Sequence, residues 1–299
     1  MKVGIWIPSV RRMASRETIR ASILQAEQLE YDSLWTIDHI IAPTANAEQF
    51  GLLYDPLIVM ALAAGLTERI QIGVSVLVLP YRHGVLTAKM VASLDDLSDG
   101  RIILGVGSGW NAAESAILRL PFEERGPMTD EYIRIMRELW TNAHPTFDGR
   151  YTQFDDVVFL PRPTQPAGPP IWVGGSSRAA LRRTVEHGDA WHPINRTPDQ
   201  LREGKADIMR LCERFQRATP PAMTLRIDVR VVLDDHPYPK PAHAGHMLIG
   251  TPDALVEQIA ELREIGVEHL SLEFVGRDFA DFTAQVEAFA TQVRPRLPA

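Results

Sequence analysis

Three short groups of residues carry side chains or backbone patterns that could do chemistry. Asp38-His39 places a carboxyl beside an imidazole, a pair that can hold and exchange a proton near neutral pH. Gly174-Gly175-Ser176-Ser177 is a glycine-rich turn with two hydroxyls, and Arg178 follows it. Gly107-Ser108-Gly109 is a second such turn, followed by Trp110. These groups indicate proton exchange and the binding of an anion.

Two of these groups also have a purely structural interpretation. Asp38 could cap a loop while His39 bonds a backbone carbonyl. Ser177 could be an ordinary N-cap after a tight turn. The choice between structure and function therefore depends on where the fold places each group.

The elements around these groups alternate in a regular way. Short apolar segments are each followed by a stretch with helical spacing, which is typical of βα units around a parallel sheet. The predicted strands are 3–7, 33–37, 70–79, 102–106, 171–173, 189–191, 224–233 and 269–274. About eight such units close a barrel, so we expect an α/β fold of the (β/α)8 TIM-barrel type. An open doubly wound sheet is the alternative, but no Gly-x-Gly-x-x-Gly follows the first strand.

We expect residues 1–299 to form one barrel domain. After the fourth helix, residues 146–170 interrupt the rhythm with alternating aromatics and several prolines, which predicts a strand-bearing insertion and a linker. Residues 234–248 are predicted to be a loop before the last βα unit. Ser98 to Arg101 is interpreted as structural, with Gly100 ending a helix and Arg101 at the stability face of the barrel.

The composition of the chain limits the classes of molecule that it could bind. A formal net charge of −7 argues against nucleic acid or an anionic membrane, so we expect a small-molecule substrate. The one cysteine, Cys212, excludes paired-thiolate metal sites and an internal disulfide. His243 and His246 have no third ligand nearby, so no metal site is predicted. The chain opens on an apparent strand and has no 18-residue apolar run, which favours a cytoplasmic protein.

Function follows from position in such a barrel, because active sites lie at the C-terminal ends of the strands. Asp38-His39, Gly107-Ser108-Gly109 and the turn at 174–177 all come directly after predicted strands. His39 is therefore the predicted acid/base residue, and the amides of the turn at 174–177 are predicted to hold a phosphate, with Arg178 adding charge. Trp110, Trp191 and His192 are predicted to line the substrate pocket.

The sequence resembles the luciferase-like monooxygenase superfamily, and within it the branch of F420-dependent oxidoreductases. The resemblance extends over nearly the whole chain. The matching segments are 26–35, Asp38-His39, 67–73, 94–101, 105–110, 170–177 and 188–191.

The resemblance implies a cofactor, a chemistry and partners. It implies hydride transfer between coenzyme F420 and an organic substrate; the alternatives are a reduced-FMN monooxygenase fed by a separate flavin reductase, and a non-catalytic flavin-binding barrel. It also implies a homodimer and a non-proline cis peptide between Ser75 and Val76 at the cofactor site.

The resemblance also orders the candidate site residues. Asp38 is expected to hold His39 or to contact the coenzyme. Glu114, a helical turn beyond Trp110, ranks second to His39 as the catalytic acid. The sugar-phosphate dehydrogenases of the branch carry a glutamate where this chain has Trp110, so that substrate is not expected, and the tryptophan suggests an apolar substrate surface.

Overall fold

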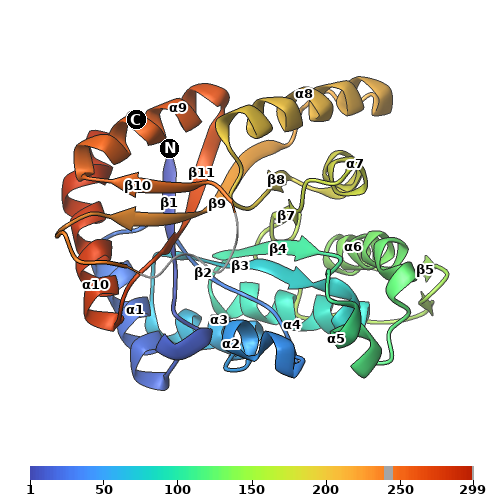
Figure 1. Ribbon diagram of the computed structural model, residues 1–299. Coiled ribbons are helices and arrows are strands. Elements are labelled where there is room, and N and C mark those ends of the chain that lie inside the picture. The colour runs from blue at the N-terminus through green and yellow to red at the C-terminus, as the bar shows by residue number, and fades with distance from the viewer. Residues whose placement is uncertain (239–244, 298–299) are drawn as a thin grey trace.

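Eight parallel strands close into a barrel in the computed structural model, which describes residues 1–238 and 245–297 (Figure 1). Each strand pairs in parallel with the next, and pairing of the last with the first closes the ring. The strands are β1 (Lys2–Trp6), β2 (Ser33–Thr36), β3 (Gln71–Val78), β4 (Ile102–Gly107), β7 (Ile171–Gly174), β8 (Ala190–His192), β9 (Ala222–Val231) and β11 (Val267–Phe274). The predicted TIM barrel is confirmed.

The helices lie outside the strands, as Figure 1 shows. The larger ones are α1 (Arg16–Gln28), α3 (Pro56–Leu66), α4 (Gly84–Leu97), α6 (Arg125–Thr141), α7 (Arg178–His187), α8 (Pro198–Phe215), α9 (Pro252–Ile265) and α10 (Phe279–Ala288). Their starts follow local chemistry: the Asp55 carboxylate accepts the Leu57 N–H at 2.9 Å, and Pro56 stands at the first helical position of α3. None of the helices in the described ranges is long and apolar enough to cross a membrane.

Two short helices belong to the barrel mouth. They are α2 (Ala47–Phe50), which was not predicted from the sequence, and α5 (Ala112–Ile117), which contains Glu114 in the helical turn expected beyond Trp110. Both follow strands that carry candidate site residues, and the single turn of α2 shows too little periodicity to be recognised.

The segment predicted as an insertion contains a small antiparallel pair, β5 (Phe147–Asp148) and β6 (Gln153–Phe154). The predicted loop at 234–248 ends differently, because β10 (Met247–Gly250) begins inside it and pairs in parallel with β9. Four residues after a loop rich in proline and histidine give no alternation to recognise. His243 lies outside the described residues.

Aromatic side chains fill the barrel interior. The Trp35 ring stacks on His192 with centroids 5.3 Å apart and packs against Trp172 at 4.9 Å. A Cβ on Gly73 would lie 2.3 Å from the Trp35 ring, so the neighbouring strand needs a glycine there. At the N-terminal end, Arg101 donates to the Ser98 carbonyl at 2.7 Å and to the Thr67 hydroxyl at 2.8 Å, as the structural interpretation predicts.

Candidate active site at the barrel mouth

His39 is paired with Glu114 at the mouth of the barrel. His39 Nδ1 lies 2.6 Å from Glu114 Oε2, and the other carboxylate oxygen accepts the N–H groups of Ile40 and Ile41 at 2.6 and 3.2 Å. The sequence interpretation ranked Glu114 second to His39 as an independent proton donor. In the structure Glu114 is buried in the first turn of α5 and faces the imidazole. The two residues form one unit.

The protonation of the pair follows from its contacts. Burial alone would raise the pKa of Glu114, but the hydrogen bonds from His39, Ile40 and Ile41 outweigh burial and lower it. An ionised carboxylate only accepts hydrogen bonds, so Nδ1 of His39 carries a proton. No hydrogen bond from a described residue occupies His39 Nε2. That nitrogen is the one free to exchange a proton with a substrate.

Two aromatic rings surround the imidazole. The Phe50 ring lies 4.0 Å from His39, centroid to centroid, and the Trp110 ring meets it edge-on at 5.9 Å. Trp110 is 59% exposed, which is unusual for the largest apolar side chain. It therefore presents an apolar surface next to His39.

Asp38 does not contact His39 through any hydrogen bond between described residues. Its oxygens accept two hydrogen bonds from Arg82, at 2.7 and 2.9 Å, and one from the Val78 N–H at 2.9 Å. Arg82 also binds Asp55, the cap of α3. Because the carboxylate is buried and saturated, it ties the end of β2 to the end of β3. Asp38 therefore holds Arg82 and not His39, and its expected contact with the coenzyme stays a prediction.

The end of β3 forms the floor of the mouth. The peptide bond between Ser75 and Val76 is cis, as the resemblance predicts. The half-buried Val76 side chain projects among glycines: a Cβ on Gly107 would lie 2.7 Å from it, and one on Gly174 2.9 Å. These two glycines therefore make room for Val76. Ser108 is half-buried, and Gly109 has φ of +80° in the turn after β4.

The turn at 174–177 leads into the N-terminus of α7. Ser177 caps this helix by accepting the Ala180 N–H. The Ser176 hydroxyl is buried and has no hydrogen-bond partner within residues 1–238 and 245–297, and Arg178 is exposed beside it. Gly175 has φ of +93°, a conformation that a side chain would strain. An unpartnered hydroxyl beside free helical amides is what an anion-binding turn offers before its ligand arrives.

The other two predicted pocket residues lie elsewhere. The Trp191 ring packs outside the barrel, where a Cβ on Gly204 of α8 would lie 2.1 Å from it, and its Nε1 donates to the Gly175 carbonyl at 2.8 Å. His192 is inside the barrel, 2.9 Å from the Ser75 hydroxyl and 2.7 Å from the Thr224 hydroxyl. Burial and the nearby Arg226 lower the pKa of His192 to about 3, so it is neutral. We do not retain either residue in the substrate pocket.

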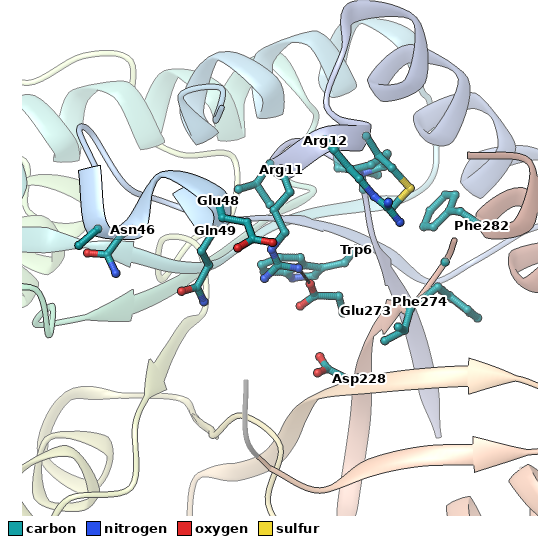
Figure 2. Close-up of a pocket in the computed structure, with 17 residues that line it drawn as sticks. Trp6, Arg11, Arg12, Asn46, Glu48, Gln49, Asp228, Glu273, Phe274 and Phe282 are labelled. Carbon is teal, nitrogen blue, oxygen red and sulfur yellow. Dashed lines mark hydrogen bonds and ion pairs between the residues drawn. The ribbon is translucent and has the colours of Figure 1, made fainter. Parts of the chain in front are cut away.

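A charged cluster at the ends of β1, β9 and β11 was not predicted. Glu273 accepts hydrogen bonds from Arg11 and Arg226, each at 2.6 Å, and the Arg226 guanidinium lies 3.5 Å from the Trp6 ring centre. Trp6, Arg11 and Glu273 line a cavity of about 570 Å³. Figure 2 shows these three side chains around it, with Asp228 projecting into it from β9. The sequence signal was the alternation of charged residues in Arg226-Ile227-Asp228, because alternate residues of a barrel strand point inward.

The two carboxyls of this cluster differ in charge. They lie opposite each other on neighbouring strands. Burial alone would raise the pKa of Glu273, but Arg226 and Arg11 lower it to about 2. Burial and the charge of Glu273 raise the pKa of Asp228 to about 7. Pairs with separated pKa values are typical of sites that bind or exchange protons.

The barrel carries a histidine–glutamate pair and a glycine-rich turn at its mouth, where barrel enzymes place their active sites. Residues 1–239 match the model of the luciferase-like monooxygenase family. The chain belongs to this family, which is a family of oxidoreductases.

Relatives named for F420 and relatives without a known function are both similar to this chain. The F420-dependent glucose-6-phosphate dehydrogenase of Amycolatopsis mediterranei is 27% identical over 100% of this chain and 99% of its own length. An uncharacterised protein of Mycobacterium tuberculosis is 34% identical over 48% of this chain and 51% of its own length. The chain thus matches about half the length of relatives of this second kind.

Solved structures share the fold at low sequence identity. An F420-dependent secondary alcohol dehydrogenase in complex with an F420–acetone adduct superposes with a TM-score of 0.78 at 17% identity, over 100% of this chain and 99% of that one. The oxygenating component of a diketocamphane monooxygenase from Pseudomonas putida, in complex with FMN, superposes with a TM-score of 0.80 at 20% identity. This match covers 100% of this chain and 99% of that one. Both F420 and FMN enzymes therefore share this barrel.

Proposed function

We propose that this chain is an F420-dependent oxidoreductase that transfers hydride between the deazaflavin and an uncharged organic substrate. The observation that carries the proposal is the His39–Glu114 pair, whose imidazole lies 5.9 Å from the ring of the exposed Trp110, centroid to centroid. Relatives named for F420 support the cofactor. A reduced-FMN monooxygenase is the second candidate, favoured by the FMN complex that shares the fold.

The residues present fit a cofactor with a phosphate and a flat ring. The unpartnered Ser176 hydroxyl, the open Gly175 and the N-terminus of α7 suit a phosphate. The turn at 107–109 and Val76 suit a ring face, because glycines keep that floor free of other side chains. Arg178 would add charge next to the phosphate.

The chain's own residues supply the proton chemistry, and the bound deazaflavin supplies or accepts the hydride. Oxidation of an alcohol removes a hydride from carbon and a proton from oxygen, and reduction of a ketone reverses both. His39 Nε2 is placed to take or give that proton. Glu114 fixes the imidazole with its proton on Nδ1 and stabilises it when it becomes charged. Phe50 and Trp110 limit the access of water.

Trp110 argues against a sugar phosphate as substrate. An exposed tryptophan beside the acid/base residue offers apolar contact and no hydrogen bond acceptor. The similarity to a glucose-6-phosphate dehydrogenase therefore supports the cofactor and not the substrate.

The test replaces His39 with alanine and, separately, with asparagine. Single-turnover rates of F420 oxidation or reduction are measured with a panel of secondary alcohols and ketones, alongside F420 affinity. We expect the hydride step to fall on the order of a hundredfold or more, because positioned acid/base groups contribute about 10²–10⁴-fold. F420 affinity should stay within about threefold. Rates within about threefold of the parent in both variants would make His39 a structural residue.

A further inference from the structure

We propose that the cavity between β1, β9 and β11 binds the substrate, and that Asp228 and Trp6 recognise a hydroxyl group on an otherwise uncharged, apolar molecule. This inference rests on the proposed function, since it names the substrate class of the same barrel mouth. The volume of the cavity, about 570 Å³, is in the range of small-molecule sites.

Two buried polar atoms of this cavity have no hydrogen-bond partner among the described residues. They are Oδ1 of Asp228, which is 2% exposed, and Nε1–H of Trp6, which is 3% exposed. Buried polar groups are almost always paired, because leaving one unpaired costs about 1–3 kcal/mol. One atom accepts and the other donates. A hydroxyl is the smallest group that can satisfy both.

The charges around the cavity favour a neutral ligand. Arg11, Arg12 and Glu48 line it together with Asp228 and Glu273, and Arg226 lies behind Trp6. Glu273 already engages Arg11 and Arg226, and Arg12 donates to the Arg277 carbonyl. A phosphate or carboxylate would have to compete with Glu273 for these arginines.

One side of the cavity is apolar, and the cavity adjoins the proposed site of reaction. Val10, Met13, Phe274 and Phe282 contribute apolar surface. The segment 45–49 borders the cavity, and the next residue, Phe50, packs on His39. Arg226 also donates to the Ser75 carbonyl at 3.2 Å, which links the cluster to the floor of the mouth. A ligand held in this cavity can extend toward His39 and toward the floor of the mouth.

The experiment compares three ligands with one carbon skeleton: cyclohexanol, cyclohexanecarboxylate and cyclohexylamine. Their affinities for the full chain are measured by ligand-detected NMR, with and without saturating F420. We expect cyclohexanol to bind best. Asp228→Leu should weaken it roughly tenfold or more, and Trp6→Phe, which keeps a ring under Arg226, several-fold. Glu268→Gln, an exposed acid at the far end of β11, is the matched control and should bind as the parent does.

Two results would overturn the inference. One is tighter binding of the carboxylate or the amine than of the alcohol. The other is parental affinity for cyclohexanol in Trp6→Phe and in Asp228→Leu, or in Trp6→Phe alone if the leucine variant does not fold. The F420 titration separates the two proposals: a parent that binds cyclohexanol but not F420 contradicts the proposed coenzyme and leaves the hydroxyl site standing.

Discussion

The carboxylate of Glu114 sets the proton on the imidazole of His39, although 75 positions separate the two residues. Glu114→Gln tests this directly. The glutamine oxygen can still accept from Ile40 and Ile41, but its NH2 group would then face Nδ1 and favour the opposite tautomer. We expect the hydride step to slow by at least tenfold, with F420 affinity unchanged.

Tyr81→Phe is the control for this prediction. Tyr81 donates to the same Glu114 oxygen at 3.0 Å, so its loss removes a hydrogen bond but leaves the imidazole tautomer alone. We expect a smaller loss of rate than for Glu114→Gln. Equal losses in the two variants would mean that Glu114 acts only by packing.

Asp228 should make stability depend on pH. Its pKa is raised in the folded chain, so folding favours the protonated acid. The stability that Asp228 contributes is therefore full below its pKa in the unfolded chain, near 4, and is lost as the pH rises toward 7. Glu273, Arg226, Arg11 and Asn195 are the groups that face or influence it. Asp228→Asn should therefore be more stable than the parent at pH 8, on the order of 1 kcal/mol, and show little gain at pH 4. Thermal unfolding at the two pH values measures this, and a gain independent of pH would contradict it.

At the scale of elements, the N-terminus of α7 separates ligand binding from helix stability. Ser176→Ala removes a hydroxyl without a partner, whereas Ser177→Ala removes the helix cap. We expect Ser176→Ala to weaken F420 binding by about tenfold with unchanged thermal stability. Ser177→Ala should lower stability by about 1 kcal/mol.

The serine pair tests this turn more cleanly than a bulky substitution at Gly175 would. The φ of +93° at Gly175 would strain any side chain there, so a substitution would change fold stability as well as F420 binding. Parental F420 affinity in Ser176→Ala would remove the turn from the coenzyme site.

The alternation of strands and helices was predictable because each strand is a short apolar segment between helices with a clear period. The site was predictable only in part. His39 and the turn at 174–177 follow strands directly, so their place at the mouth could be predicted from chain order. The partner of His39 could not, because the direction of Glu114 is set by α5, a helix of six residues capped by Asn111. Asp228 was missed because charged residues inside an apolar strand were counted as part of the strand.

At the scale of the whole molecule, we expect a homodimer through the outer faces of α3 and α4. Ile58, Leu62 and Leu86 are 65%, 39% and 54% exposed there. Such a group of exposed apolar side chains is typical of an interface. Ile58→Glu combined with Leu62→Glu should give monomers in light scattering, whereas Met209→Glu, on α8, should not. A monomeric parent would contradict this expectation.

The most direct test of the proposed function is a binding titration of the purified chain with F420 and with FMN, each oxidised and reduced. We expect saturable binding of F420 in at least one redox state and much weaker binding of FMN. We also expect Ser176→Ala to weaken the F420 isotherm and His39→Ala to leave it unchanged. Tight binding of reduced FMN without measurable binding of F420 would contradict the proposed function and favour the monooxygenase.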